Sequence, residues 1–128
     1  MFYASLFFSL NVNGAEADSI KVENLLKDAL SLPTDSCRTL HFARQLVGTP
    51  YVAGTLDTSL EEQLVVHLDK VDCTTFVETV LALAIADKQT HRNYQAFKDA
   101  LASIRYRNGE LDGYASRLHY FSDWIKDN

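Results

Sequence analysis

Residues 71–86 read VDCTTFVETVLALAIA, and after Glu78 no charged residue follows until Asp87. A run this apolar and of helical length has to be covered by protein on most of its sides. Asp72 can cap the start of such a helix through Thr74 or Thr75. The stretch therefore predicts a helix over 73–86 that lies at the centre of the core and begins at a cysteine.

The sequence on both sides of this helix predicts four further helices. Apolar residues at helical spacing over 19–31, ended by Pro33, indicate the first. Thr34 or Asp35 can cap a second, which Gly48 would close in a left-handed conformation. The expected buried stripe of the second helix is Leu40, Ala43, Leu46 and Val47. That of the fourth helix is Tyr94, Phe97, Leu101 and Ile104. That of the last helix is Leu118, Phe121, Trp124 and Ile125. The fourth helix should be buried on one face only, and residues 64–69 (LVVHLD) are the one short strand or extended link expected.

Composition limits the class of protein. The chain has 128 residues, of which 47% are hydrophobic and 23% charged, as expected for one globular domain. Its formal charge is −5 and no basic cluster interrupts the acidic balance, so we expect neutral or cationic partners and no nucleic acid. The only cysteines are Cys37 and Cys73, which excludes a disulfide framework and a thiolate zinc site.

The first segment has the features of an export signal. Residues 1–12 are apolar over about a dozen positions, fewer than the roughly 20 that a membrane span needs. Ala15-Glu16-Ala17 has the small-x-small pattern of a signal-peptidase site. We therefore expect residues 1–17 to be the remnant of a signal peptide, residues 18–128 to form the domain, and the protein to be periplasmic or in the cell envelope. No cation precedes Lys21, so an edge strand or a buried helix is the alternative.

Cys73 is the leading candidate for chemistry. At the first turn of a helix, unpaired backbone N–H groups and the positive end of the dipole favour a thiolate. The same N–H groups can stabilise the oxyanion that forms when a carbonyl is attacked. Two other roles stay open on the residues alone: a small buried side chain at the helix start, and a disulfide with Cys37.

A cysteine nucleophile needs a base, and His119 has the most suitable neighbourhood of the four histidines. If 116–126 is helical, His119 and Asp123 share one face, although a solvated pair is the simpler interpretation. Arg117 beside them would ordinarily be solvated. Tyr51 lies in a glycine-containing loop and can contact a ligand or anchor the core. Metalloprotease, phosphate-loop and dinucleotide motifs are absent. Glu61-Glu62 on one side and Asp69 on the other could supply the two carboxylates of a glycosidase, although adjacent acids in a polar stretch are usually solvated.

The motifs GTPYVAG at 48–54 and VDCTTFVE at 71–78 resemble those of the NlpC-type papain-like cell-wall hydrolases. GTPYVAGTLD, EEQLVVHLDKVDCTTFVE and IRYRNGELDGYASRLHYFSDWIKDN, with the distances between them, resemble the N-acetylmuramoyl-L-alanine amidase-like branch from about Gly48 onward. The resemblance implies an α+β papain-like fold. It also implies a Cys73 nucleophile that cleaves the amide between N-acetylmuramic acid and L-alanine of a muropeptide, with a preference for muropeptides that carry 1,6-anhydro-muramic acid. No metal or cofactor is implied, and the substrate-binding residues would be Tyr51, Asp72, Arg117 and His119.

The sequence departs from this family in one respect. The family's catalytic histidine lies on a strand of a C-terminal sheet, and no matching segment occurs within these residues, so we expect that histidine beyond residue 128. The chain would then be the helical N-terminal half of one cysteine amidase domain, inactive alone, with a partly uncovered core helix that promotes association. Two alternatives remain: a non-catalytic module that binds muropeptides or a protein, and an endopeptidase that cleaves after D-glutamate of the stem peptide.

Overall fold

The computed structural model describes residues 13–128, which form five α-helices and two short 3₁₀ turns. The helices are α1 (Gly14–Ala29), α2 (Arg38–Gln45), α3 (Cys73–Asp87), α4 (Tyr94–Arg105) and α5 (Phe121–Asp127). The 3₁₀ turns are η1 (Arg107–Gly109) and η2 (Tyr114–Ser116).

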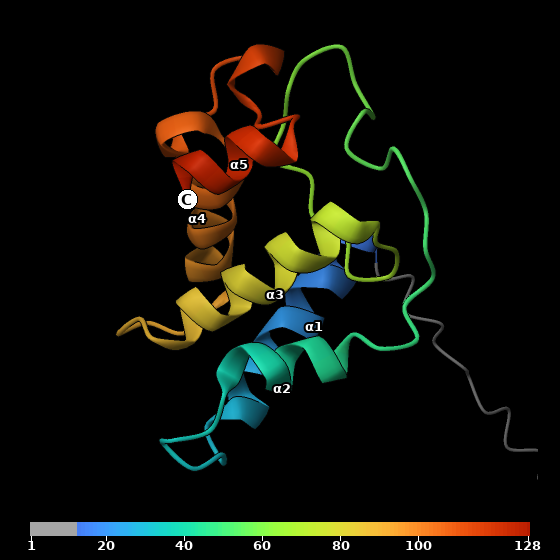
Figure 1. Ribbon diagram of the computed structural model, residues 1–128. Helices are drawn as coiled ribbons and strands as arrows, with labels where there is room; N and C mark the ends of the chain where they lie inside the picture. Colours follow the sequence, from blue (N-terminus) through green and yellow to red (C-terminus); the bar gives the residue numbers. More distant parts are fainter. Residues whose placement is uncertain (1–12) are drawn as a thin grey trace, which may run out of the picture.

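Helix α3 is the centre of the fold, as its apolar sequence predicts. It lies between α1 and α2 on one side and α4 on the other, and α5 packs against α4 (Figure 1). Ala82, Leu83 and Ala86 of α3 are fully buried. The main cluster joins them to Val22 and Leu26 of α1 and to residues of α2 and α4. The burial of a face on each surrounding helix, rather than helix propensity, holds α3 in place.

The described residues contain almost no sheet. Two isolated bridges are present, a parallel one between Tyr51 and Val71 and an antiparallel one between Tyr106 and Arg117. Of the two forms predicted for residues 64–69, a short strand and an extended link, the structure has the link, because the segment pairs with no neighbouring strand. The helical part of the α+β expectation is therefore confirmed, whereas a papain-like sheet lies beyond what these residues show. No helix among residues 13–128 has the length and hydropathy needed to cross a bilayer.

Helix α1 begins earlier than its apolar spacing predicts. Asn13 accepts a hydrogen bond from the Glu16 N–H and so starts the helix at Gly14 rather than near Ser19. Ala15–Ala17, the expected cleavage site, lies in the first turn. The apolar segment at 1–12 is outside the described residues, so the export signal stays a prediction.

Helix α2 differs from its predicted cap and stripe. It begins after Cys37 without a side-chain cap, rather than after Thr34 or Asp35. Phe42 and Leu46 are buried, whereas the predicted core residues Leu40 and Val47 are exposed. The helix thus begins two to three residues later than the predicted caps place it, and its buried face includes Phe42 rather than Leu40. Gly48 follows with φ at +91°, the left-handed conformation that its position predicts.

The last two helices show where spacing succeeds and where it fails. Helix α4 buries Phe97, Leu101 and Ile104 on one face, as predicted. Helix α5 begins only at Phe121, and of its expected stripe Leu118 and Trp124 are buried while Phe121 and Ile125 are exposed. Five of the seven residues of α5 are exposed.

Candidate active site

The start of α3 is fixed by a reciprocal capping box. The Asp72 carboxylate accepts hydrogen bonds from the Thr75 N–H (2.8 Å) and the Thr75 hydroxyl (3.0 Å). The Asp72 N–H donates in return to the Thr75 hydroxyl oxygen at 2.8 Å. Of the two capping partners that the sequence offers, the structure thus uses Thr75. This cap sets where the helix begins and therefore where Cys73 lies.

Cys73 is the first residue of α3 and is exposed. Its Sγ lies 4.0 Å from the Thr74 hydroxyl oxygen, and both Cys73 and Cys37 are free thiols. The two alternatives for this residue, a buried filler and a disulfide with Cys37, are therefore wrong in this structure. An accessible thiol at the first turn of a 15-residue helix lies where free backbone N–H groups favour negative charge.

Tyr51 is brought next to this helix start by its backbone. The Val52 N–H donates to the Val71 carbonyl (2.9 Å), and the Val71 N–H donates to the Pro50 carbonyl (3.0 Å). The loop carrying Tyr51 is thereby held beside the residue two positions before Cys73. The Tyr51 side chain itself is exposed, so it is not the core anchor that the sequence left open.

A cleft of about 180 Å³ lies beside the start of α3. It brings together three of the predicted substrate-binding residues, Asp72, Arg117 and His119, although they come from distant parts of the chain. Tyr51 is not part of its lining. The full lining is Gly54, Thr55, Leu56, Asp57, Asp72, Thr74, Glu78, Arg117, Leu118 and His119. Cys73 is not part of the lining either, but its two chain neighbours, Asp72 and Thr74, are.

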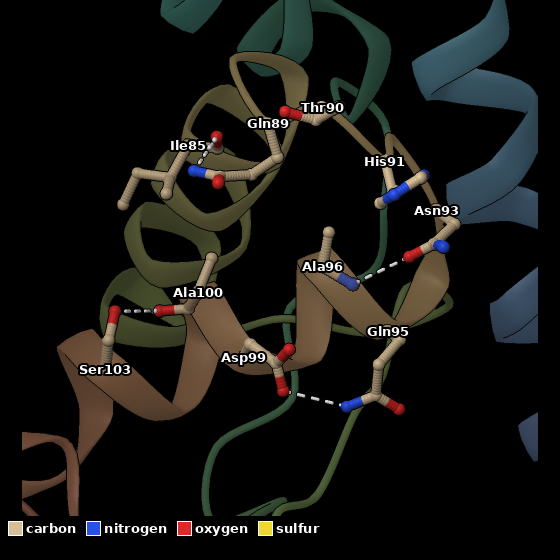
Figure 2. Close-up of a pocket in the computed structure, with 10 residues that line it drawn as sticks. All are labelled: Ile85, Gln89, Thr90, His91, Asn93, Gln95, Ala96, Asp99, Ala100 and Ser103. Atoms are coloured by element: carbon tan, nitrogen blue, oxygen red, sulfur yellow. Dashed lines mark hydrogen bonds between the residues drawn. The ribbon is translucent and has the colours of Figure 1, made fainter.

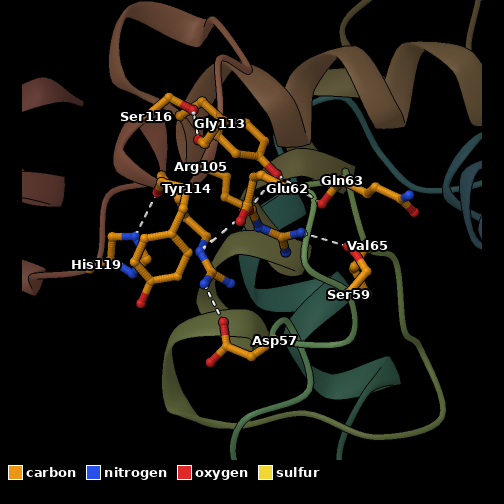
Figure 3. A network of polar contacts seen from close by, with 12 residues as sticks. Asp57, Ser59, Glu62, Gln63, Val65, Arg105, Gly113, Tyr114, Ser116 and His119 are labelled. Atoms are coloured by element: carbon orange, nitrogen blue, oxygen red, sulfur yellow. Dashed lines mark hydrogen bonds and ion pairs between the residues drawn. The ribbon is translucent and has the colours of Figure 1, made fainter.

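Asp57, Glu78 and Arg117 of the cleft lining belong to an ion-pair network that joins α3, α4, the loop before α3 and the segment between η2 and α5. Figure 3 shows part of this network. Arg105 donates to Glu78 at 2.8 Å and to the Val65 carbonyl at 2.5 Å. Arg117 pairs with Glu62, with its Nε 3.4 Å from Oε1, and its Nη2 hydrogen-bonds Asp57. These contacts hold the 55–65 segment against the helices and so shape the cleft.

Burial and neighbouring charges shift the pKa values of two carboxyl groups and one phenol in this network. Burial raises the pKa of Glu78, and the neighbouring Arg105 opposes this shift. Burial and the nearby Glu62 carboxylate raise the pKa of Tyr106 to about 12, so its hydroxyl keeps its proton and donates to Glu62 (3.1 Å) and the Gln63 carbonyl (3.0 Å). The hydrogen bond and the charge of Arg117 lower the pKa of Asp57, which stays ionised.

His119 and Arg117 differ from what the sequence predicts of them. Residue 119 precedes α5, so His119 and Asp123 do not share a helical face, and Asp123 instead lies 3.9 Å from Arg107. The His119 Nε2 lies 2.8 Å from the Tyr114 carbonyl oxygen, and its ring packs 4.2 Å from the Tyr114 ring. Arg117 is buried rather than solvated, because Asp57 and Glu62 neutralise it.

Sequence reasoning missed Asp57, Glu62 and Glu78 as parts of this site. Glu78 carried a signal, because it is a lone charge on an otherwise apolar helix and therefore needs a buried partner. Glu62 was weighed as a glycosidase acid, but its carboxylate is held by Tyr106 and Arg117. Asp57 had no signal beyond its place in the GTLD stretch.

A larger groove of about 670 Å³ lies between the end of α3 and α4 (Figure 2). Ile85 and Gln89 line one side, and Ala96 and Asp99 line the other. Ile85 is twelve residues beyond Cys73 on the same helix, a separation of about 18 Å. Volume alone does not identify the site, and we place the chemistry at the smaller cleft. Among residues 13–128, no three His, Cys, Asp or Glu side chains gather as metal ligands.

Together these features define a small helical unit whose central helix begins with an exposed cysteine, and the start of this helix borders an arginine-containing cleft. The chain belongs to the AmiA-like family, described as N-acetylmuramoyl-L-alanine amidase-like, which it matches over residues 41–128. No curated protein is a significant match to the chain.

Solved structures of several bacterial proteins are similar to the chain. An N-acetylmuramoyl-L-alanine amidase from Bacteroides uniformis is 46% identical, with a TM-score of 0.66 over 70% of this chain and 37% of its own. A Bacteroides fragilis protein provisionally named a xylanase is 49% identical, with a TM-score of 0.65 over 69% of this chain and 38% of its own. A Legionella pneumophila protein of the DUF1460 family is 28% identical, with a TM-score of 0.69 over 91% of this chain and 39% of its own.

The chain thus spans less than two fifths of the length of these three structures. The family expected from the sequence is confirmed at the level of the amidase-like branch.

Proposed function

We propose that this chain carries the nucleophile and part of the substrate cleft of a peptidoglycan hydrolase that cleaves the N-acetylmuramoyl-L-alanine amide of muropeptides. The observation that supports this most is the exposed Cys73 at the first turn of α3, whose neighbours Asp72 and Thr74 line a cleft together with Arg117 and His119. Membership of an amidase-like family supplies the substrate class.

In the proposed reaction the Cys73 thiolate attacks the lactyl carbonyl carbon of the muramoyl amide. The backbone N–H groups at the start of α3 stabilise the oxyanion. The C–N bond then breaks, the L-alanine nitrogen leaves as a protonated amine, and water hydrolyses the thioester. The proton donor is a histidine that we expect beyond residue 128, while His119 contacts the substrate. As the substrate arises in the cell envelope, we propose that the protein acts there, after export.

The test is product identification by mass. A muropeptide ending in 1,6-anhydro-N-acetylmuramic acid is incubated with the chain joined to any residues that follow it in its gene, and the variants Cys73→Ser and Cys37→Ser are compared. We expect free sugar and intact stem peptide, loss of turnover in Cys73→Ser, and normal turnover in Cys37→Ser. Cleavage after D-glutamate would identify an endopeptidase. Binding without turnover, unaffected by alkylation of Cys73, would identify a non-catalytic module.

A further inference from the structure

Arg117 is a buried cation in the wall of the cleft. Its side chain is 6% exposed, its guanidinium carbon lies 5.3 Å from the centre of the Tyr114 ring, and it shares the cleft with Asp72 and His119. Its Nε has no hydrogen bond of good geometry, because Glu62 approaches it only to 3.4 Å. The guanidinium therefore has donor capacity that its buried partner does not use.

The two carboxylates around Arg117 are held very differently. Glu62 is 6% exposed and is fixed by the Tyr106 hydroxyl, so it is a permanent partner of Arg117. Asp57 is 62% exposed and lies in the loop before α3. Within residues 13–128, its carboxylate has no hydrogen-bond donor other than Arg117. Asp57 is thus the partner that can leave without exposing a buried charge of its own.

We propose that Arg117 binds a carboxylate of the substrate and that Asp57 occupies this position when no ligand is bound. This inference rests on the proposed function for its ligand, a stem peptide that carries free carboxylates, and it adds the group by which the cleft recognises that peptide. Exchange of one carboxylate for another leaves the charge of the cleft unchanged, and the planar guanidinium fork fits a carboxylate in two parallel hydrogen bonds.

The size of the cleft agrees with this role. Its volume of about 180 Å³ is below the roughly 300–1,000 Å³ of pockets that enclose a small ligand. It therefore accommodates one group of the substrate, while the rest lies along the surface toward Cys73. The chain as a whole carries a formal charge of −5, which disfavours anionic ligands. An anion can still bind in this cleft, because its recognition depends on the nearby guanidinium of Arg117.

The test compares two ligands that differ only in the proposed group. The first ligand is N-acetylmuramoyl-L-alanyl-D-glutamate with its γ-carboxyl capped as a methylamide and its α-carboxylate free. The second is the same compound with an α-carboxamide, so that it carries no carboxylate. Each is titrated calorimetrically into the Cys73→Ala chain, which cannot turn either over. We expect tighter binding of the carboxylate. Asp57→Asn should raise its affinity about two- to fivefold by removing an exposed competitor, and should leave the carboxamide affinity unchanged. Glu61→Gln, a neighbouring exposed acid, is the matched control and should change neither.

A second variant tests the arginine itself. Arg117→Lys keeps the charge but loses the fork, so we expect it to remove most of the preference for carboxylate over carboxamide, with folding checked by circular dichroism. Equal affinities for the two ligands, no measurable binding of either, or an unchanged carboxylate affinity in Asp57→Asn would overturn the inference. Because the assay measures binding alone, its failure would leave the Cys73 reaction untouched, and failure of that reaction would not affect this result.

Discussion

Replacing Glu78 with methionine is expected to lower the free energy of unfolding by about 3–5 kcal/mol, because the change leaves a buried arginine without its counter-ion. The Arg105 Nε lies 2.8 Å from Glu78 Oε2, and the two side chains are 3% and 2% exposed. With charge centres ~4 Å apart and an effective dielectric constant of ~20, the lost attraction is about 4 kcal/mol. The remaining hydrogen bond from Arg105 to the Val65 carbonyl does not neutralise the charge.

The reverse change, Arg105→Met, should behave differently with pH. Arginine cannot release its proton, whereas a glutamate left alone can take one up. Burial already raises the pKa of Glu78 above 4.5, so the stability cost of ionising it appears as pH rises through that raised value. We therefore expect the destabilisation by Arg105→Met to shrink on acidification, and that by Glu78→Met to persist.

Urea unfolding followed by the helical circular dichroism signal measures both variants and the double variant. The double variant replaces the pair with two apolar side chains and should lie close to wild type or above it. Single variants that each cost less than about 1 kcal/mol would refute the reasoning, because the pair would then behave as an exposed one. So would a double variant whose cost equals the sum of the two single costs.

Three further predictions concern stability and are measured by the same unfolding experiment. Burial raises the pKa of Asp18 above 3.8, so the stability of the wild type should fall as pH rises through the raised value. Asp18→Asn keeps the acceptor for the Leu68 N–H (2.9 Å) and should not show this fall in stability. Identical pH profiles for the two proteins would contradict this prediction. Thr75→Val removes the hydroxyl that accepts from the Asp72 N–H and should cost about 1 kcal/mol, whereas no loss would mean that the capping box is unimportant. Leu83→Ala, at a fully buried position of the central helix, should cost about 2–5 kcal/mol, and a cost typical of a surface site would show that α3 is not the core.

The sequence predicts well those helices whose buried residues form a strong apolar pattern. The positions of α3 and α4 follow from periodicity, and Asp72 follows as the cap because its side chain acts locally. Patterning is less informative where packing decides the outcome. Helix α2 is short, so Phe42 rather than Leu40 determines which face is buried. Residues 64–69 have strand-like composition, but the described chain offers them no neighbouring strand.

In the candidate site, too, features set by local sequence are predictable and features set by tertiary packing are not. Cys73 is predictable, because its reactivity would arise from its own helix. The pairing of Arg117 with Asp57 is not, because the two residues are 60 positions apart and meet only through tertiary packing. For His119 and Asp123 the sequence predicted a contact that the structure lacks. Their spacing fits one face of a helix, but α5 begins at Phe121, so only Asp123 belongs to it.

The measurement that bears most directly on the central claim is the alkylation rate of Cys73 relative to Cys37. Both thiols are free and exposed and both adjoin the start of a helix, but Cys73 lies inside the first turn of a capped 15-residue helix, whereas Cys37 precedes an uncapped helix of 8 residues. With Cys37→Ser and Cys73→Ser variants, iodoacetamide labelling near neutral pH is followed by intact mass. We predict that Cys73 reacts several-fold faster. Equal rates, or a slower Cys73, would contradict its assignment as the nucleophile.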